Sequence, residues 1–145
     1  MLRAVLDTNV FVSSLLNKTG APARLIDAWR AGKYMLVTSP AIMAKIKAVL
    51  ELPRIRKKYP LTDHDIRQVL DLLEKDAILV PGRSQVRIAI PQDPTDHMFL
   101  SCALEAGADV IVSGDRYLLS LKEFEGIPIM PVAQFLERLA EQRLP

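Results

Sequence analysis

Short apolar runs alternate with longer segments of helical periodicity along the 145-residue sequence. The runs have the length of buried strands, which we expect at residues 2–6, 34–37, 78–80, 110–112 and 127–130. Between them, apolar residues recur three and four positions apart, which predicts helices at 22–31, 40–50, 62–75, 96–106, 117–121 and 131–142. We also expect a half-exposed strand at 86–90 and a basic connector at 54–59. This alternation favours an α/β fold, a three-layer α/β/α sandwich with a central, mainly parallel sheet.

The composition fits one ordinary globular domain. Half of the residues are hydrophobic, and the formal net charge is +2, too small to indicate nucleic acid without a local basic patch. The single cysteine, Cys102, excludes an internal disulfide, and no apolar run approaches the roughly 18 residues that span a bilayer. Arg3 and Asp7 interrupt the apolar start, so it does not resemble a secretory signal. We therefore expect a single domain over residues 1–145, no membrane association and a cytoplasmic location.

Acidic residues occur where the predicted strands end. Asp7 follows the first strand, Asp115 follows the strand at 110–112, and Asp96 opens a helix, with Asp93 three residues before it. Ligands of open α/β sheets bind beyond the carboxyl ends of the strands, where such helix starts also lie. Clustered carboxylates repel one another, and a hard divalent cation such as Mg²⁺ removes that conflict. The pattern predicts a metal site able to cleave phosphodiesters; taken singly, each acid fits a turn or helix cap equally well.

Several short motifs, taken in order, resemble those of PIN domains. The similarity covers nearly the whole chain and includes bacterial and archaeal VapC-like toxins of toxin–antitoxin pairs. The opening motif is resembled by Val5-Leu6-Asp7-Thr8-Asn9-Val10, and the central acidic motif by Asp93-Pro94-Thr95-Asp96 with Phe99-Leu100. The third motif is resembled by Val112-Ser113-Gly114-Asp115. The C-terminal strand and helix are resembled by Gly126-Ile127-Pro128-Ile129 and Phe135-Leu136.

The resemblance implies a Mg²⁺- or Mn²⁺-dependent endoribonuclease that cleaves single-stranded RNA. It also implies a small antitoxin protein as partner, which would block the site, and a homodimer, which is common in the family. The metal ligands, or the residues that hold ligand waters, would be Asp7, Asp96 and Asp115. Asn9 and Ser113 would orient these carboxylates by hydrogen bonds, and Asp93 would be a peripheral acid.

Lys45 departs from the family pattern. PIN domains of this group usually carry Glu on the helix after the second strand, and aligning that helix start with Thr38-Ser39-Pro40 places Lys45 there. Glu51 lies six residues further on, about 600° around a helix, so it is a poor substitute. The hypothesis is an impaired nuclease, with a non-catalytic RNA- or antitoxin-binding module as the alternative. A lysine can also bind phosphate through its point charge. The alternative without a functional role is that Lys45 points into solvent.

A basic stretch begins within this helix and continues into the connector after it. Six cations stand close together, and four of them are candidate RNA contacts: Lys47, Arg54, Arg56 and Lys57. The alternatives are a solvated helix end or a surface for an acidic partner. His97 is weighed as a ligand or general acid, and Cys102 as a core residue. A phosphotransfer receiver domain is disfavoured because the strand at 78–80 ends in Pro81-Gly82, without the required Asp.

Overall fold

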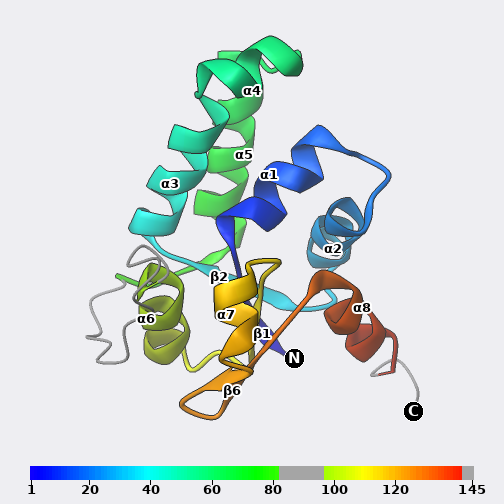
Figure 1. Ribbon diagram of the computed structural model, residues 1–145, viewed down its shortest axis with the longest axis vertical. Coiled ribbons are helices and arrows are strands. Elements are labelled where there is room, and N and C mark those ends of the chain that lie inside the picture. Colours follow the sequence, from blue (N-terminus) through cyan, green and yellow to red (C-terminus); the bar gives the residue numbers. More distant parts are fainter. Residues whose placement is uncertain (82–96, 142–145) are drawn as a thin grey trace.

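The central sheet of the protein, seen in a computed structural model that describes residues 1–81 and 97–141, is mainly parallel. Its order is β3-β2-β1-β4-β6-β5, and all neighbouring strands are parallel except β5 and β6 (Figure 1). The described strands are β1 (Arg3–Leu6), β2 (Met35–Thr38), β3 (Ile78–Leu79), β4 (Val110–Val112), β5 (Glu123–Phe124) and β6 (Ile127–Met130). The prediction of a central, mainly parallel sheet is confirmed.

Helices cover both faces of this sheet. They are α1 (Thr8–Leu16), α2 (Ala21–Arg30), α3 (Pro40–Leu50), α4 (Pro53–Lys58), α5 (Asp63–Asp76), α6 (His97–Ala106), α7 (Arg116–Ser120) and α8 (Val132–Glu141). Helix α6 packs on β1, β2 and β4, whereas α2 and α8 contact each other on the opposite side of the sheet (Figure 1). The three-layer α/β/α arrangement is therefore confirmed.

Two helix starts follow from local chemistry that the sequence displays. The Ser39 hydroxyl accepts the Ile42 N–H at 3.3 Å, and Pro40 occupies the first turn of α3. Thr62 and Asp65 form a reciprocal capping box at the start of α5, with bonds of 3.1 and 2.9 Å. These caps fix where α3 and α5 begin, and α3 carries Lys45 toward the sheet.

The core lies between the sheet and its helices. Strands β1, β2 and β4 are almost wholly buried, as their near-continuous apolar sequences require of a parallel sheet. On the side of α2 and α8, the rings of Tyr34 and Phe135 meet edge to face at 5.3 Å. The Tyr34 hydroxyl donates to the Leu25 carbonyl at 2.9 Å, so its buried polar end is satisfied.

Three elements differ from expectation. Residues 9–16 had no predicted element, but Asp7 caps α1 there. The segment expected as a basic connector is mostly the short helix α4, because Pro53 both ends α3 and occupies the first turn of the next helix. The two-residue strand β5 forms through its pairing with β6 rather than through any pattern of its own. The strand expected at 86–90 lies outside the described residues.

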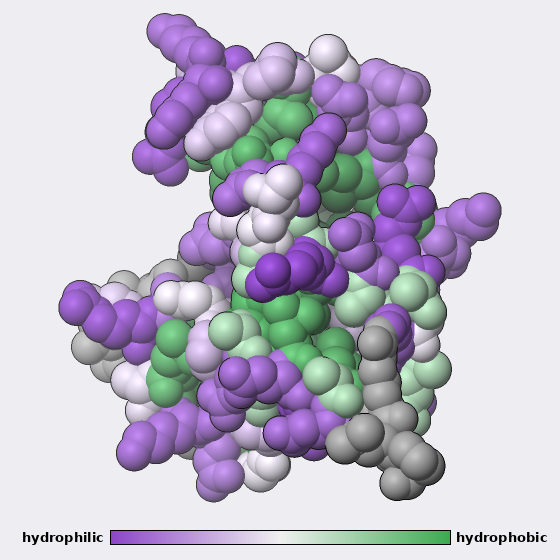
Figure 2. All heavy atoms as spheres, turned by 90° about the vertical axis from the view of Figure 1, so that its right-hand side faces the viewer, coloured by the Kyte–Doolittle hydropathy of each residue, from purple (hydrophilic) through white to green (hydrophobic). Residues whose placement is uncertain are grey.

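Helices α3, α4 and α5, which we call the helical arm, extend away from the sheet at the top of Figure 1. Between the arm and helices α1 and α2 lies an apolar groove of about 930 Å³. Figure 2 shows this hydrophobic hollow beneath the polar end of the arm. Apolar side chains that line it include Phe11, Leu15, Leu16, Ile26, Trp29, Leu61, Val69 and Leu72. Within the described ranges, no helix combines the length and apolar character needed to cross a bilayer.

Candidate functional site

The carboxyl ends of β1 and β4 bring predicted site residues together. Leu6 pairs with Val112 in the parallel register, and the Asp7 N–H extends the ladder to the Val112 carbonyl at 2.9 Å. The next residues along each chain segment, Asp7 and Ser113, are therefore neighbours although 106 positions separate them. Asp115 follows two residues after Ser113, so both acids lie at one sheet edge.

Asp7 is a buried carboxylate with only partial compensation. Its residue is 3% exposed; the Ser113 hydroxyl donates to Oδ2 at 2.7 Å, and the Asn9 main-chain N–H donates to Oδ1 at 3.4 Å. Burial raises the pKa of Asp7 above its ordinary value, against the opposing effects of the Ser113 and Asn9 hydrogen bonds and of the Lys45 charge. A cation beside Asp7 would relieve the cost of keeping it ionised.

Ser113 connects the two acids. It is fully buried, donates its hydroxyl proton to Asp7 and accepts the Asp115 N–H at 2.9 Å. Asp115 in turn accepts the N–H groups of Tyr117 and Leu118 at 2.7 and 3.1 Å, which caps α7. Both acids are therefore helix caps as well as site candidates, and the negative charge of Asp115 contributes to raising the pKa of Asp7. The expected contact of Ser113 with a site carboxylate is present; Asn9 contributes its main chain.

Among residues 1–81 and 97–141, three buried polar atoms at strand or helix ends have no described hydrogen-bond partner. They are Thr8 Oγ1 in the first turn of α1, Thr38 Oγ1 at the end of β2, and His97 Nε2 at the start of α6. Buried polar groups are normally satisfied, so such atoms are candidates to meet a ligand or its waters. Sequence reasoning did not single out the threonines; a hydroxyl at a buried strand end is the signal that points to Thr38.

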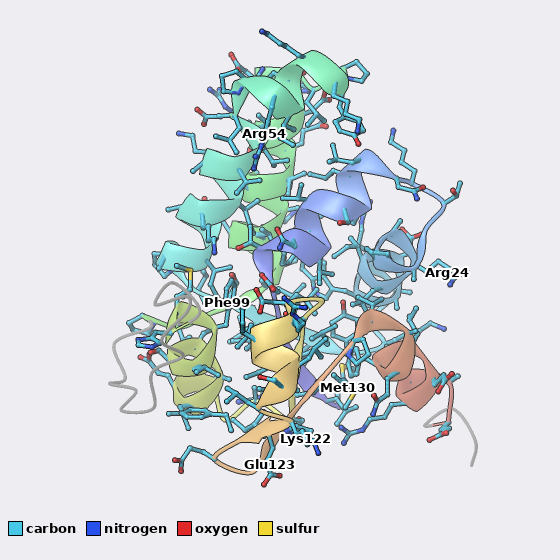
Figure 3. All side chains as sticks on the ribbon, viewed as in Figure 1. Arg24, Arg54, Phe99, Lys122, Glu123 and Met130 are labelled. Atoms are coloured by element: carbon cyan, nitrogen blue, oxygen red, sulfur yellow. The ribbon has the colours of Figure 1, made fainter. Side chains whose placement is uncertain are left out.

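Lys45 approaches the same place from α3. Its Nζ lies 5.5 Å from the centre of the Phe99 ring, which belongs to α6, and its charge lowers the pKa of Asp7. Figure 3 shows Phe99 between α6 and α7, below α3. Lys45 is only half-exposed, so it does not extend freely into solvent. Glu51, expected to be a poor substitute for the family's Glu, lies at the far end of α3 and pairs with Lys47 at 3.8 Å.

Asp93 and Asp96 both lie outside the described residues, since α6 is described from His97 onward. Within residues 1–81 and 97–141, no group of three or more acidic, histidine or cysteine side chains is positioned to hold a metal ion. The roles of Asp93 and Asp96 therefore stay predictions.

The four candidate RNA contacts lie on the helical arm. Arg54 is on α4 at the top of Figure 3, well above Phe99. Two of the four candidate RNA contacts are engaged within the arm: Lys47 pairs with Glu51, and Arg56 binds the Asp63 carboxylate and the Leu61 carbonyl. The other two candidates, Arg54 and Lys57, are exposed.

Comparison with known families identifies the fold. A model of the PIN domain matches residues 3–117, which include β1, β4, Asp7, Ser113, Lys45 and Asp115. The chain belongs to the PIN domain family. PIN domains are generally nucleases, which are hydrolases, and generally use divalent metal ions. The family assignment thus agrees with the resemblance of the opening and third motifs.

The chain is also similar to individual proteins over most of its length. The uncharacterized protein MJ1680 of Methanocaldococcus jannaschii is 30% identical over 122 residues, which cover 84% of this chain and 76% of that protein. Among solved structures, PAE2754 from Pyrobaculum aerophilum has a TM-score of 0.66 at 18% identity, covering 97% of this chain and 91% of that chain.

Two further solved structures are complexes with DNA. VapBC2 from Rickettsia felis, bound to a promoter fragment, has a TM-score of 0.58 at 11% identity, over 90% of this chain and 98% of that chain. DNA-bound VapBC from Salmonella typhimurium has a TM-score of 0.57 at 16% identity, over 91% and 99% of the two chains. At these identities, the likeness shows the fold alone.

The donor atoms of the described acidic side chains are chemically suited to a divalent ion. Asp7 offers a buried carboxylate whose ionisation burial opposes, and Asp115 offers a second carboxylate at the same edge. Oxygen ligands of this kind suit Mg²⁺ or Mn²⁺. Lys45 opposes such an ion, because its positive charge acts on Asp7.

Proposed function

We propose that this PIN domain is a metal-dependent endoribonuclease that cleaves single-stranded RNA and acts as the toxin of a toxin–antitoxin pair. The observation that carries the proposal is the hydrogen-bonded series Asp7–Ser113–Asp115 at the carboxyl edge of a PIN fold. Asp7 and Asp115 would hold Mg²⁺ or Mn²⁺, together with Asp96, the acid of the central family motif. When bound, that ion would supply activation of water and charge neutralisation at phosphorus.

The chain's own residues prepare the site. Ser113 keeps one Asp7 oxygen fixed, so the carboxylate is presented in one orientation. The same hydroxyl accepts the Asp115 N–H, which ties the start of α7 to the end of β1. Burial of Asp7 keeps bulk water from one side of it, which strengthens its attraction for a cation. Asn9 is exposed next to Asp7 and would reach the incoming phosphodiester or the ligand waters.

A second function is favoured by one observation, the position of Lys45. A positive charge beside Asp7 weakens the field that attracts a divalent ion. The chain would then bind RNA or an antitoxin without efficient cleavage. Activity, rather than the fold, distinguishes the two functions.

The partner proposed from family resemblance is a small antitoxin protein. Two of the solved structures of the same fold are VapBC complexes, and this chain has an apolar groove between the helical arm and α1–α2 that a partner could cover. A second copy of the chain is the other proposed partner. Light scattering of the isolated chain, and of the chain with its genomic neighbour, would separate a homodimer from a heteromeric complex. A cytoplasmic location, where RNA substrates occur, is part of the same proposal.

The direct test is cleavage of a fluorophore-quenched single-stranded RNA with Mn²⁺, Mg²⁺ or EDTA. We expect cleavage that needs the metal and that falls at least about a hundredfold in Asp7→Asn, because removing a ligand charge disables the site. Asp27→Asn is the matched control, since Asp27 is exposed on α2. Cleavage that survives Asp7→Asn or EDTA would reject the proposal. If no variant cleaves but Asp7→Asn changes RNA binding, the binding module is favoured.

A further inference from the structure

Helix α7 begins at the carboxyl edge of the sheet, directly after Asp115 (Figure 1). Its first two residues are Arg116 and Tyr117, and Asp115 Oδ1 accepts the Tyr117 N–H at 2.7 Å. The Asp115 N–H is in turn bonded to Ser113, which donates its hydroxyl proton to Asp7. The main chain of Tyr117 is therefore tied to one of the acids that would hold the metal ion.

The ring of Tyr117 is partly open to solvent. Among residues 1–81 and 97–141, three large hydrophobic side chains are exposed, and Tyr117, at 39%, is the aromatic one. The next residue, Leu118, is fully buried in the core, and consecutive residues of a helix point about 100° apart. Burial of Leu118 therefore turns Tyr117 outward, where its ring can meet a ligand.

Arg116 brings a second flat group, which is charged, to the same ring. Its guanidinium carbon lies 5.8 Å from the centre of the Tyr117 ring, within the range of a cation–π contact. In the part of the chain that the structure describes, Arg116 forms no ion pair, in contrast to Lys47 and Arg56 on the helical arm. Arg116 is also exposed, so its donors can meet an anion such as a backbone phosphate.

We propose that Tyr117 and Arg116 bind one nucleotide of a single-stranded nucleic acid beside the metal site. The base stacks on the open part of the Tyr117 ring, and Arg116 contacts the adjoining phosphate. The inference rests on the proposed function and names two residues that contact its substrate. Bases of single strands have exposed faces, and stacking on aromatic rings and guanidinium planes is a common way in which proteins bind them.

The consequence is a preference for unpaired strands with little preference for sequence at this nucleotide. Every base has a flat aromatic face, so stacking on Tyr117 accepts any of them. A base in a duplex already stacks on its neighbours and reaches a protein ring only at the cost of being unstacked and unpaired. The site would thus fix an unpaired nucleotide relative to Asp115 without reading its identity.

The test uses 2-aminopurine, a fluorescent base analogue whose emission falls when it stacks, placed between uridines in a short single-stranded RNA. EDTA prevents metal-dependent cleavage, and a gel checks that the strand stays intact. We expect the unmodified chain to quench the emission. Tyr117→Ala should lose most of the quenching and should bind about tenfold more weakly by fluorescence anisotropy. Tyr117→Phe keeps the ring and should retain both. Arg116→Gln should reduce the slope of log K against log salt by about 1.

Tyr59→Ala is the matched control, because Lys58 Nζ lies 5.6 Å from the centre of the Tyr59 ring in a similar arrangement on the helical arm. It should retain most of the quenching, and circular dichroism checks that each variant folds. Unchanged quenching and affinity in Tyr117→Ala would overturn the inference. Equal losses in Tyr117→Phe and Tyr117→Ala would overturn it as well, because they would assign the effect to the hydroxyl group. If the unmodified chain binds no single-stranded RNA, the proposed function itself fails, which is a different outcome.

Discussion

The carboxyl edge of the sheet and the helical arm use charged side chains in opposite ways. At the edge, Asp7 is 3% exposed and its partner Ser113 is fully buried, so one polar group satisfies another away from water. On the arm, the ion pairs Lys47–Glu51 and Arg56–Asp63 involve mostly exposed side chains. Buried contacts of this kind are costly to break, whereas exposed ion pairs contribute little because water and salt screen them.

This contrast indicates which charged residues are built for binding. Burial opposes ionisation of Asp7 and raises its pKa, which is typical of a site built for a ligand rather than for stability. The arm carries more cations, but two of its candidate RNA contacts already bind acids of the same arm. The number of charged residues in a segment is therefore a weaker guide to function than the free-energy cost of burying each charge.

The largest effect on stability is expected at the carboxyl edge. Ser113→Ala would leave an Asp7 oxygen and the Asp115 N–H without their partner and should lower the free energy of unfolding by about 2 kcal/mol in urea titrations with EDTA. Ser120→Ala is the control, because Ser120 is exposed and bonds only its own helix, and it should cost less than about 0.5 kcal/mol. Equal losses of unfolding free energy in the two variants would show that the buried hydrogen bonds of Ser113 stabilise the fold no more than an exposed one.

An intermediate effect is expected for RNA binding by the arm. Arg54→Gln and Lys57→Gln should weaken binding of single-stranded RNA, and each should reduce the slope of log K against log salt by about 1 if it removes one phosphate contact. Lys47→Gln and Arg56→Gln should change the slope less, since these cations already have acidic partners. Fluorescence anisotropy over a range of salt concentrations measures this. Identical slopes in all four variants would remove the arm from the RNA surface.

The smallest effect is expected for the exposed pair Arg56–Asp63. The Arg56 hydrogen bond and charge lower the pKa of Asp63 below its ordinary value of 3.8, so the folded state favours the ionised acid. The small stabilisation is therefore present above the pKa of the unfolded chain and is lost as pH falls through the lower, folded pKa. Asp63→Asn should unfold slightly more easily than the unmodified chain at neutral pH and equally at strongly acidic pH. Asp71→Asn, an exposed change on the same helix, should show no such convergence.

Much of the fold could be predicted because its signals are local. Buried parallel strands are continuous apolar runs, and Ser39 and Thr62 mark helix starts by the hydrogen bonds they make. Helix α4 was missed because its sequence is basic and begins at Pro53, which also terminates α3. Strand β5 was missed because two residues, Glu123 and Phe124, have no detectable period and are ordered by pairing with β6.

The candidate site could be predicted in part for the same reason. Strand ends of a parallel sheet meet at one edge, which places Asp7 beside Ser113 and near Asp115. The location of Lys45 over Phe99 depends on how α3 crosses α6, a matter of tertiary packing with no local signal. The unpartnered hydroxyls of Thr8 and Thr38 likewise become visible only once burial is known.

The most direct test of the central claim is a crystal structure of the chain soaked with Mn²⁺, with anomalous scattering recorded at the manganese edge. We expect an anomalous peak within coordination distance of an Asp7 oxygen. The peak should be absent from Asp7→Asn crystals grown in the same way. An Asp7 carboxylate without a peak at saturating Mn²⁺, or a peak confined to other acids, would contradict the claim.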